Sequence, residues 1–364
     1  MRSGFKKIGF LSALILPLLF ILGLELGGVW LGAIHLFVFL LIPLMDFWVS
    51  KDTRNVPKES VSKEAKAIFY QLITHVWVVV QLGVLFWTCY RLSQESYSLT
   101  SWLLLVSGAA LVTGGIGITV AHELGHKSRP LDQWFAKVLL MTVGYMHFII
   151  EHNRGHHVHV ATPKDPATSR EGENFYAFWW RSVSQGYLNA WQLEKERLGK
   201  KGSSNWSWSN QMIQFHLITV CFWVISTLVF SLSQSRWVWE VPVFLISQGI
   251  LAFTLLELVN YLEHYGMSRR LLPNGRYERV TPMHSWNASQ RISNFLLFQL
   301  QRHSDHHAFA SKPYQILDHH EDSPQLPAGY SAMIIIALFP PLWFKLMNPR
   351  LEDWRKKNQS WSIQ

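Results

Sequence analysis

Histidines recur in four tight groups along this chain, and each group lies next to an apolar stretch. Nine of the seventeen histidines belong to these groups. Imidazole is a good ligand for zinc, copper, iron and nickel, and nine imidazoles are more than one ion can bind. The sequence therefore predicts a two-metal centre. In chain order the groups are His122-Glu-Leu-Gly-His126, His152-Asn-Arg-Gly-His156-His157, Glu263-His264 and His303-Ser-Asp-His306-His307.

The spacing inside the groups indicates how ligands are shared. Residues i and i+4 lie on one face of a helix, so a pair with this spacing can bind one ion together. The pairs expected to do so are His122 with His126 and His152 with His156. Successive helical residues point ~100° apart, so the adjacent histidines of the second and fourth groups should diverge. Two diverging pairs favour two ions over one.

A zinc peptidase is the sharpest alternative. The first group matches H-E-x-x-H, in which Glu123 would be the general base. Such a site needs one further ligand and leaves six histidines without a role. We therefore interpret Glu123 as a residue outside the ligand set that orients an imidazole. A non-enzymatic metal carrier would need ligands along a path through the membrane, whereas these lie on one side.

Other histidines are interpreted as structural, because a single imidazole at a helix end is usually an ordinary polar residue. Three lie in or near apolar runs, namely His35, His75 and His216. Three more lie close to the groups and are expected to support them without binding metal, namely His147, His159 and His284.

Six apolar segments are long enough to position these groups at a membrane. A helix needs ~20 mostly apolar residues to cross the hydrocarbon core. The predicted fold is therefore all-α, one membrane-embedded unit over residues 1–364. The predicted spans are Ile8–Leu26, which we expect to be retained, Val29–Val49, Ile68–Tyr90, Ser101–Ala121, Met212–Leu232 and Val238–Tyr261. Gly27-Gly28 predicts a tight hairpin between the first two spans, and the Gly- and Ala-rich stretch 107–117 predicts close helix packing.

Lysine and arginine counts predict the orientation. The segment Ser50–Lys66 carries five, whereas the turns after the third and fifth spans carry one each, Arg91 and Arg236. The basic segments are expected in the cytoplasm. With six spans, residues 122–211 and 262–364 are then cytoplasmic, and all four histidine groups face the same compartment.

Three further segments complete the expected organisation. Trp134–Ile150 is apolar but short for a span, and a crossing there would separate the first two histidine groups. We interpret it as a re-entrant or surface-lying helix. Met333–Met347, broken by Pro340-Pro341, is interpreted as interfacial. Lys164–Asn210 is polar and Trp-rich, which predicts a cytoplasmic cap.

Composition excludes several classes of protein. The two cysteines, Cys89 and Cys221, both lie inside apolar runs. They exclude a disulfide framework and any cysteine-based zinc or iron–sulfur site. The net charge of +9 is explained by lysines and arginines that flank spans and contact anionic lipids. We expect no nucleic-acid partner.

Taken together, the motifs resemble the alkane 1-monooxygenases, integral-membrane non-haem di-iron enzymes of the fatty-acid desaturase and hydroxylase superfamily. The resemblance covers roughly residues 43–351. It rests on HELGHK at His122–Lys127, EHNRGHH at Glu151–His157, NYLEHYG at Asn260–Gly266 and LQRHSDHH at Leu300–His307, with ATPKDPATSR at Ala161–Arg170 and HSWN at His284–Asn287. Membrane desaturases and xylene-type monooxygenases share the histidine spacings, but the residues around the histidines in the last two histidine motifs favour the alkane 1-monooxygenases.

The resemblance implies the chemistry. It implies two iron ions, dioxygen as co-substrate, and hydroxylation of medium- to long-chain n-alkanes to 1-alkanols in a bacterial inner membrane. Electrons would come from rubredoxin, reduced by an NAD(P)H-dependent reductase, because this chain has no CxxC pair of its own. Fatty-acyl desaturation and methyl-aromatic hydroxylation are the alternatives. The implied iron ligands are His122, His126, His152, His156, His157, His264, His303, His306 and His307.

The substrate has no polar group, so its binding must come from burying methylenes, at ~0.8 kcal/mol per CH₂. We expect a tunnel between helices that ends blindly at the irons and presents the terminal carbon first. The second span, Val29–Val49, should line it. Val38, small and about two turns before Asp46, is the residue predicted to limit chain length.

Overall fold

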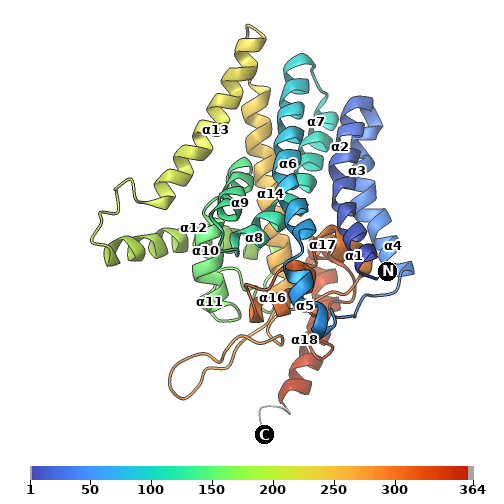
Figure 1. Ribbon diagram of the computed structural model, residues 1–364, viewed down its shortest axis with the longest axis vertical. Helices are drawn as coiled ribbons and strands as arrows, with labels where there is room; N and C mark the ends of the chain where they lie inside the picture. The colour runs from blue at the N-terminus through green and yellow to red at the C-terminus, as the bar shows by residue number, and fades with distance from the viewer. Residues whose placement is uncertain (1, 360–364) are drawn as a thin grey trace.

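The computed structural model describes residues 2–359, and this part of the chain is helical, with two isolated bridges and no strand. Six helices are long and apolar enough to cross a membrane, which confirms the predicted number (Figure 1). They cover Lys6–Leu26, Gly28–Trp48, Ile68–Gln94, Leu99–Gly125, Gln211–Ser233 and Glu240–His264.

Several of these spans are built from more than one helical element. The first contains α1 (Arg2–Phe10), η1 (Leu11–Leu14) and α2 (Ile15–Leu26); the second contains η2 (Gly28–Gly32), α3 (Ala33–Leu36), the π-helix η3 (Phe37–Leu41) and α4 (Ile42–Trp48). The third is α6 (Ile68–Gln94), and the fourth contains α7 (Leu99–Ala110), the π-helix η4 (Leu111–Ile118) and α8 (Thr119–Gly125). The fifth and sixth are α13 (Gln211–Ser233) and α14 (Glu240–His264).

Two spans extend about one turn beyond their predicted apolar ends. The fourth continues from Ala121 to Gly125, and the sixth continues from Tyr261 to His264. His122 therefore lies in the last turn of the fourth span, and His264 is the last residue of the sixth. The apolar criterion ended these helices early because their final turns are polar.

Glycine allows two close approaches that the sequence predicted. Gly27 ends α2 with a φ of 66°, in the left-handed region that glycine tolerates, and closes the first hairpin. In the fourth span, a Cβ at Gly114 would lie 2.6 Å from the backbone of Ala252 in α14. Only glycine lets these two helices pack this closely.

The segment Trp134–Ile150 is not among the six helices that could cross a membrane. It contains α9 (Pro130–Thr142) and, after a turn at Gly144, α10 (Phe148–Glu151). The turn lies at mid-depth, because Val143 and Gly144 pack against Gly249 of the sixth span and Trp223 of the fifth. The chain therefore enters the bundle and returns on the same side, which selects the re-entrant alternative.

Buried glutamines stabilise the inner end of this re-entrant segment. Gln248 Nε2 donates to the Thr142 carbonyl at 2.8 Å, and Gln81 Nε2 donates to Thr142 Oγ1 at 2.7 Å. Thr113 Oγ1 in turn donates to Gln248 Oε1 at 2.8 Å. Non-helical backbone is tolerated at membrane depth only where protein groups satisfy it; here the third and sixth spans supply those groups, and the fourth span supports Gln248.

The remaining elements lie at one end of the bundle. The predicted cap contains α12 (Phe175–Lys200), which in Figure 1 runs roughly across the axis of α13 and α14. The segment Met333–Met347 falls in α17 (Tyr330–Ala337) and α18 (Pro340–Gln359), and the chain bends by 119° between them, just before the proline pair. The short elements are α5 (Lys58–Ala65), the π-helix η5 (His152–His156), α11 (His157–His159), α15 (Arg291–Leu296), α16 (His303–Ala308) and η6 (Tyr314–Ile316).

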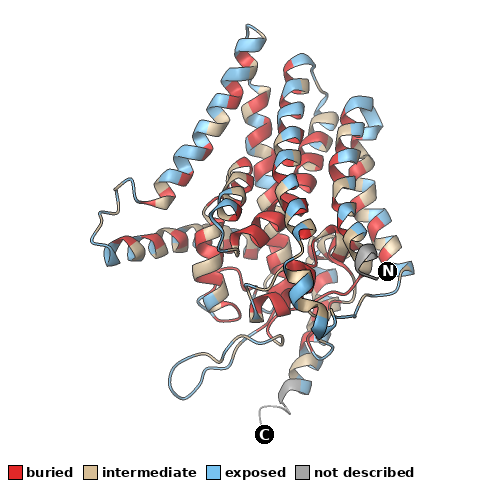
Figure 2. Cartoon of the chain, in the orientation of Figure 1, coloured by how far each residue is buried: buried red, intermediate tan, exposed pale blue. Residues whose placement is uncertain are grey.

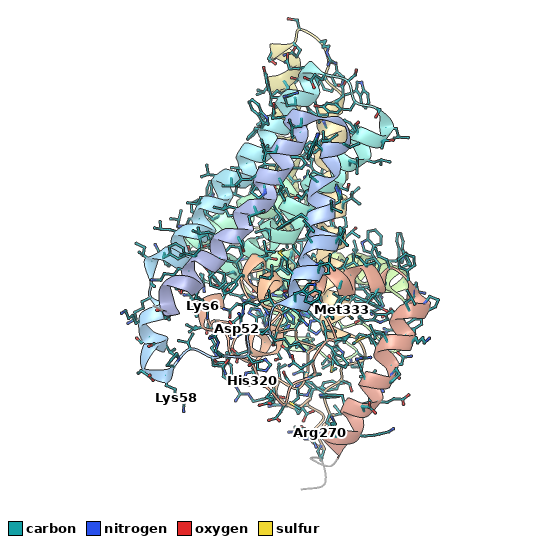
Figure 3. The ribbon with its side chains drawn as sticks, turned by 90° about the vertical axis from the view of Figure 1, so that its right-hand side faces the viewer. Lys6, Asp52, Lys58, Arg270, His320 and Met333 are labelled. Atoms are coloured by element: carbon teal, nitrogen blue, oxygen red, sulfur yellow. The ribbon has the colours of Figure 1, made fainter. Side chains whose placement is uncertain are left out.

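Buried residues concentrate around α8, the lower part of α14 and α16 (Figure 2). The basic segment between the second and third spans lies at this end too, as Lys58 shows in Figure 3, and so does Arg270 in the loop after the sixth span. Buried Arg302 ties the two regions together by donating to the carbonyls of Asp52 and Arg54 at 3.0 and 3.1 Å. The residue preceding His303 is thereby fixed to a segment 250 residues earlier.

Candidate metal centre

The nine histidines of the four sequence groups meet at one end of the bundle, in two clusters. In each cluster, one nitrogen from every ring lies within 4.8 Å of the others, and histidine is the only residue type. The five-histidine cluster consists of His122, His126, His152, His157 and His306. The four-histidine cluster consists of His156, His264, His303 and His307.

Nitrogen spacings in both clusters fit ligands of a shared ion. In the five-histidine cluster, Nε2 of His152 lies 3.1 Å from Nε2 of His126 and 3.0 Å from Nε2 of His157. In the four-histidine cluster, Nε2 of His303 lies 2.8 Å from Nε2 of His307 and 3.2 Å from Nε2 of His264. Neighbouring ligands ~2.1 Å from one ion lie ~3 Å apart.

An unsatisfied nitrogen supports the same interpretation. Nε2 of His122 is buried and has no hydrogen-bond partner within residues 2–359. A buried polar atom without a partner is costly and calls for an explanation. A metal ion held by the five-histidine cluster would satisfy it.

For six of the nine histidines, burial favours the neutral form that metal binding needs. Burial lowers the pKa of His126 to about 3. Burial, and next the positive charge that neighbouring rings would carry, holds the pKa of five others well below its usual range; these are His152, His157, His303, His306 and His307. Neutral imidazole is the form that coordinates metal. The clusters, together with the comparisons below, indicate a metal centre.

One ligand pairing expected from the sequence is wrong. His152 and His156 were expected to share an ion, but they belong to different clusters. The reason is local: residues 152–156 form a π-helix, whose wider turn brings residues i and i+5 onto one face. His152 therefore joins His157. The other expected pair, His122 with His126, does lie together, in ordinary α-helix.

The adjacent histidines diverge as predicted. His156 and His157 belong to different clusters, and so do His306 and His307. The clusters are nonetheless neighbours, since the ring centroids of His157 and His307 are 4.6 Å apart. Elements η5 and α16 each supply ligands to both clusters.

A carboxylate that sequence reasoning missed holds one of these rings. Asp165 Oδ2 lies 2.9 Å from Nδ1 of His156 and accepts from Thr168 Oγ1 at 2.5 Å. Burial alone would raise the pKa of Asp165, but the His156 ring and these hydrogen bonds outweigh burial and lower it. An ionised Asp165 therefore orients His156. Its place in the ATPKDPATSR motif was the available signal.

Two more carboxylates act in the same region. Glu263 Oε2 lies 3.0 Å from Nε2 of His303, and its other oxygen accepts from Tyr330 Oη at 2.6 Å. Asp305 lies 2.7 Å from both His320 Nε2 and Lys312 Nζ, which anchors α16. Neither role could be read from local spacing, because the partners are distant in sequence.

Glu123 does not have the contact expected of it. Its carboxylate pairs with Lys127, and its Oε1 lies 3.4 Å from the Tyr314 amide. Residues one apart on a helix point ~100° apart, so Glu123 faces away from the rings beside His122. The arrangement supports neither an imidazole-orienting role nor that of a general base in a zinc peptidase.

The remaining histidines lie outside both clusters, as expected. His35 contacts Ser107 Oγ at 2.7 Å, and His75 contacts Asp132 at 2.6 Å. His216 contacts Tyr187 Oη at 3.0 Å, and His284 lies 3.3 Å from Glu278.

A mostly apolar pocket leads to the clusters. Its lining includes His122 of the five-histidine cluster and His303 of the four-histidine cluster. Val38 lies in the same lining, buried and on the second span as expected. The side walls come from the first, second, fourth and sixth spans; among them are Leu16, Ile42, Ile118 and Leu255.

Comparison with known proteins gives consistent matches. Residues 100–337 match the fatty acid desaturase family. Alkane 1-monooxygenase 2 of Pseudomonas aeruginosa is 44% identical, over 91% of this chain and 86% of that protein. Alkane 1-monooxygenase 2 of Alcanivorax borkumensis is 41% identical, over 95% of this chain and 91% of that protein. The hydroxylase component of a Pseudomonas putida xylene/toluene monooxygenase is 25% identical, over 93% and 87%.

Proposed function

The chain belongs to the fatty acid desaturase family and, within it, to the alkane 1-monooxygenases. From this premise we propose that it hydroxylates the terminal carbon of medium- to long-chain n-alkanes, with dioxygen as co-substrate. The observation that carries the proposal is the apolar pocket, which reaches histidines of both clusters. An alkane has no polar handle, so a pocket of this lining is the site it requires.

The nine histidines are the ligands in this proposal, with one iron ion in each cluster. Bound iron would supply the activation of dioxygen that an unactivated C–H bond needs. The chain's own residues position the ligand rings and the substrate, and they shield the reacting carbon from water. Asp165 orients His156, and Glu263 with Tyr330 fixes the region beside His303. The apolar walls bind methylenes by burial and keep bulk water from the reacting carbon.

Electrons are proposed to come from rubredoxin, reduced by an NAD(P)H-dependent reductase. The chain is a multi-pass membrane protein by its six spans and its relatives. We place it in a bacterial inner membrane with the clusters on the cytoplasmic side, where the lysine- and arginine-rich segments lie. An acidic electron donor would be steered to that basic end.

Product analysis tests the proposal. Membranes containing the protein would receive rubredoxin, its reductase, NADH and a mixture of n-alkanes, and products would be identified by gas chromatography. We expect 1-alkanols whose yield requires dioxygen. His303→Ala should abolish them and lower the iron content. The control is His159→Ala, a nearby histidine outside both clusters, which should keep both.

The other outcomes are informative. Retained activity in His303→Ala would remove this residue from the ligand set. An unsaturated or methyl-aromatic product would move the assignment to desaturation or to hydroxylation of a methyl-aromatic. Protein that contains zinc and no iron would contradict the di-iron proposal.

A further inference from the structure

The proposed reaction consumes protons, and the pocket that binds the alkane cannot deliver them. Its balance is RH + O₂ + 2e⁻ + 2H⁺ → ROH + H₂O, with the electrons supplied by the donor protein. The alkane pocket is mostly apolar, so it lacks the continuous hydrogen-bonding groups that proton transfer requires. A separate polar route to the clusters is therefore needed. This inference rests on the proposed function.

A second cavity meets this need. It lies behind Phe148, His152 and Asn260, which line both cavities. The second cavity is more polar than the alkane pocket, because carboxylate, imidazole and hydroxyl groups line part of it, and a site with several polar partners can hold water. Its lining also includes Tyr145, His147, Glu151, His156, Ser182 and Glu257.

Glu257 is the most unusual residue in this lining. It is a buried carboxylate inside the sixth span, and no lysine or arginine pairs with it in the described chain. Its hydrogen-bond donors are neutral: Ser182 Oγ at 2.6 Å, Tyr145 Oη at 3.1 Å and Asn260 Nδ2 at 3.4 Å. An ionisable group at such a place is costly to keep and is a functional candidate by default.

Support of the fold alone does not explain an acid at this position. Glu257 does connect α14 to Ser182 of α12, but a neutral pair already makes that connection one turn earlier. There, Trp179 Nε1 donates to Thr254 Oγ1 at 3.0 Å. A glutamine at position 257 could keep both contacts, because its oxygen would accept from one hydroxyl group and its NH₂ would donate to the oxygen of the other. What a glutamine cannot do is take up and release a proton.

Polar side chains continue from the cavity to the surface. The His147 ring lies 4.4 Å from the Tyr145 ring and 5.3 Å from the Tyr187 ring, centroid to centroid. Tyr187 Oη lies 3.0 Å from Nε2 of His216, which is exposed. These groups come from four elements, or from the turns beside them, and they succeed one another between Glu257 and the protein surface at His216.

We propose that Glu257 is a proton-transfer residue, which passes protons through the polar cavity towards the histidine clusters and regains them through His147, Tyr187 and His216. Two protons cross for each alkane hydroxylated, and one oxygen atom of dioxygen leaves as water. The alkane and the protons thus reach the clusters by separate cavities that share one wall.

Glu257→Gln tests the proposal by activity. It keeps the hydrogen-bonding shape, so metal content should match that of the unmodified protein. Alkanol formation should fall about 100-fold, the usual scale of a lost acid–base group. The remaining rate should slow more in D₂O than that of the unmodified protein, because proton transfer then limits it. Glu257→Asp should restore part of the rate.

The matched control is Glu240→Gln, a carboxylate at the other end of the same helix, which pairs with Arg236. Its rate and isotope effect should be those of the unmodified protein. Alkanol formation by Glu257→Gln within twofold of that of the unmodified protein would overturn the proposal. So would an inactive Glu257→Ala alongside a fully active Glu257→Gln, since that result describes a packing role.

Infrared spectroscopy tests the route without alkane turnover. Infrared spectra of the purified full-length protein and of its Glu257→Gln variant would be subtracted from each other. The difference spectrum should contain the carbonyl band of a protonated Glu257, and this band should shift in D₂O. Tyr187→Phe should slow the shift. A missing band, or a band that never shifts, would overturn the proposal. If the protein hydroxylates no alkane, the proposed function fails, and the infrared result still decides whether Glu257 exchanges protons.

Discussion

At the scale of single residues, the histidines depend on partners that hold their rings. Metal-bound histidines commonly use the second ring nitrogen to bind a carboxylate, which fixes the ring. Asp165 does this for His156 from a buried position. The nine histidines were recognisable by type and spacing, whereas Asp165 is one acidic residue among many until the fold brings it to His156.

Asp165→Asn should weaken metal binding. The variant keeps the size of the side chain but loses the negative charge that orients and polarises His156. We expect an affinity loss of ~10–100-fold in the four-histidine cluster, seen as earlier metal release in a chelator titration. Asp322→Asn, at an exposed position, is the control. Equal release from both variants would show that Asp165 does not support a ligand.

Val38→Trp should shift the product profile towards shorter alkanes. Val38 lies in the lining of the alkane pocket, and an indole there would fill space that a longer chain needs. The measurement is gas chromatography of 1-alkanols formed from an equimolar alkane mixture. As control, Val79→Trp places the same side chain on the exposed face of the third span. A product profile unchanged by Val38→Trp would remove this residue from the tunnel.

At the scale of elements, a π-helix sorts the ligands. The element η5 and the residue after it, His157, carry three histidines, of which two belong to the five-histidine cluster and one to the four-histidine cluster. An α-helix over the same residues would have kept His152 with His156. The wider turn also brings Gly155 against the side chain of Asn189 in α12, which a Cβ at this position would push aside.

Gly155→Ala should disturb this element. The new Cβ would lie 2.6 Å from Asn189 Nδ2 and 2.8 Å from Glu151 Oε1, so the π-helix or its neighbours must move. We expect loss of metal from both clusters and a lower melting temperature, measured by metal analysis and thermal unfolding. At Gly199 in α12, a Cβ meets no atom within 4 Å, so Gly199→Ala should be neutral or stabilising by ~0.5–1 kcal/mol. A Gly155→Ala protein with full metal content would contradict this account.

At the scale of the whole molecule, six spans and one re-entrant segment bring all four histidine groups to the same end. A seventh crossing at Trp134–Ile150 would have separated the first two groups. The buried glutamines that satisfy Thr142 are what allow the chain to turn back inside the bundle. Which compartment this end faces is the prediction from lysine and arginine counts.

Cysteine labelling tests that orientation. In a Cys221→Ser background, Ser96→Cys lies in the turn after the third span and Asn274→Cys in the loop after the sixth, both exposed. A membrane-impermeant maleimide added to intact spheroplasts should label Ser96→Cys only, and lysis should expose Asn274→Cys. The reverse pattern would place the clusters outside the cell membrane.

The sequence alone determined the residue types and their approximate positions. Apolar runs of ~20 residues fixed six spans, because hydrocarbon thickness sets helix length. The histidine motifs marked the ends of spans where a metal centre belongs. The apolar runs and the histidine motifs are both local patterns, so they can be recognised in the sequence before the fold is known.

Only the tertiary structure decided how these parts combine. It divided nine histidines into five and four, because residues 152–156 form i→i+5 hydrogen bonds in place of the i→i+4 bonds of an α-helix. Packing against neighbouring elements stabilises this π-helix. It directed Glu123 away from the rings and brought Asp165, Glu263 and Glu257 to the centre. These contacts join residues on different elements, and their directions follow from packing, which local sequence does not encode.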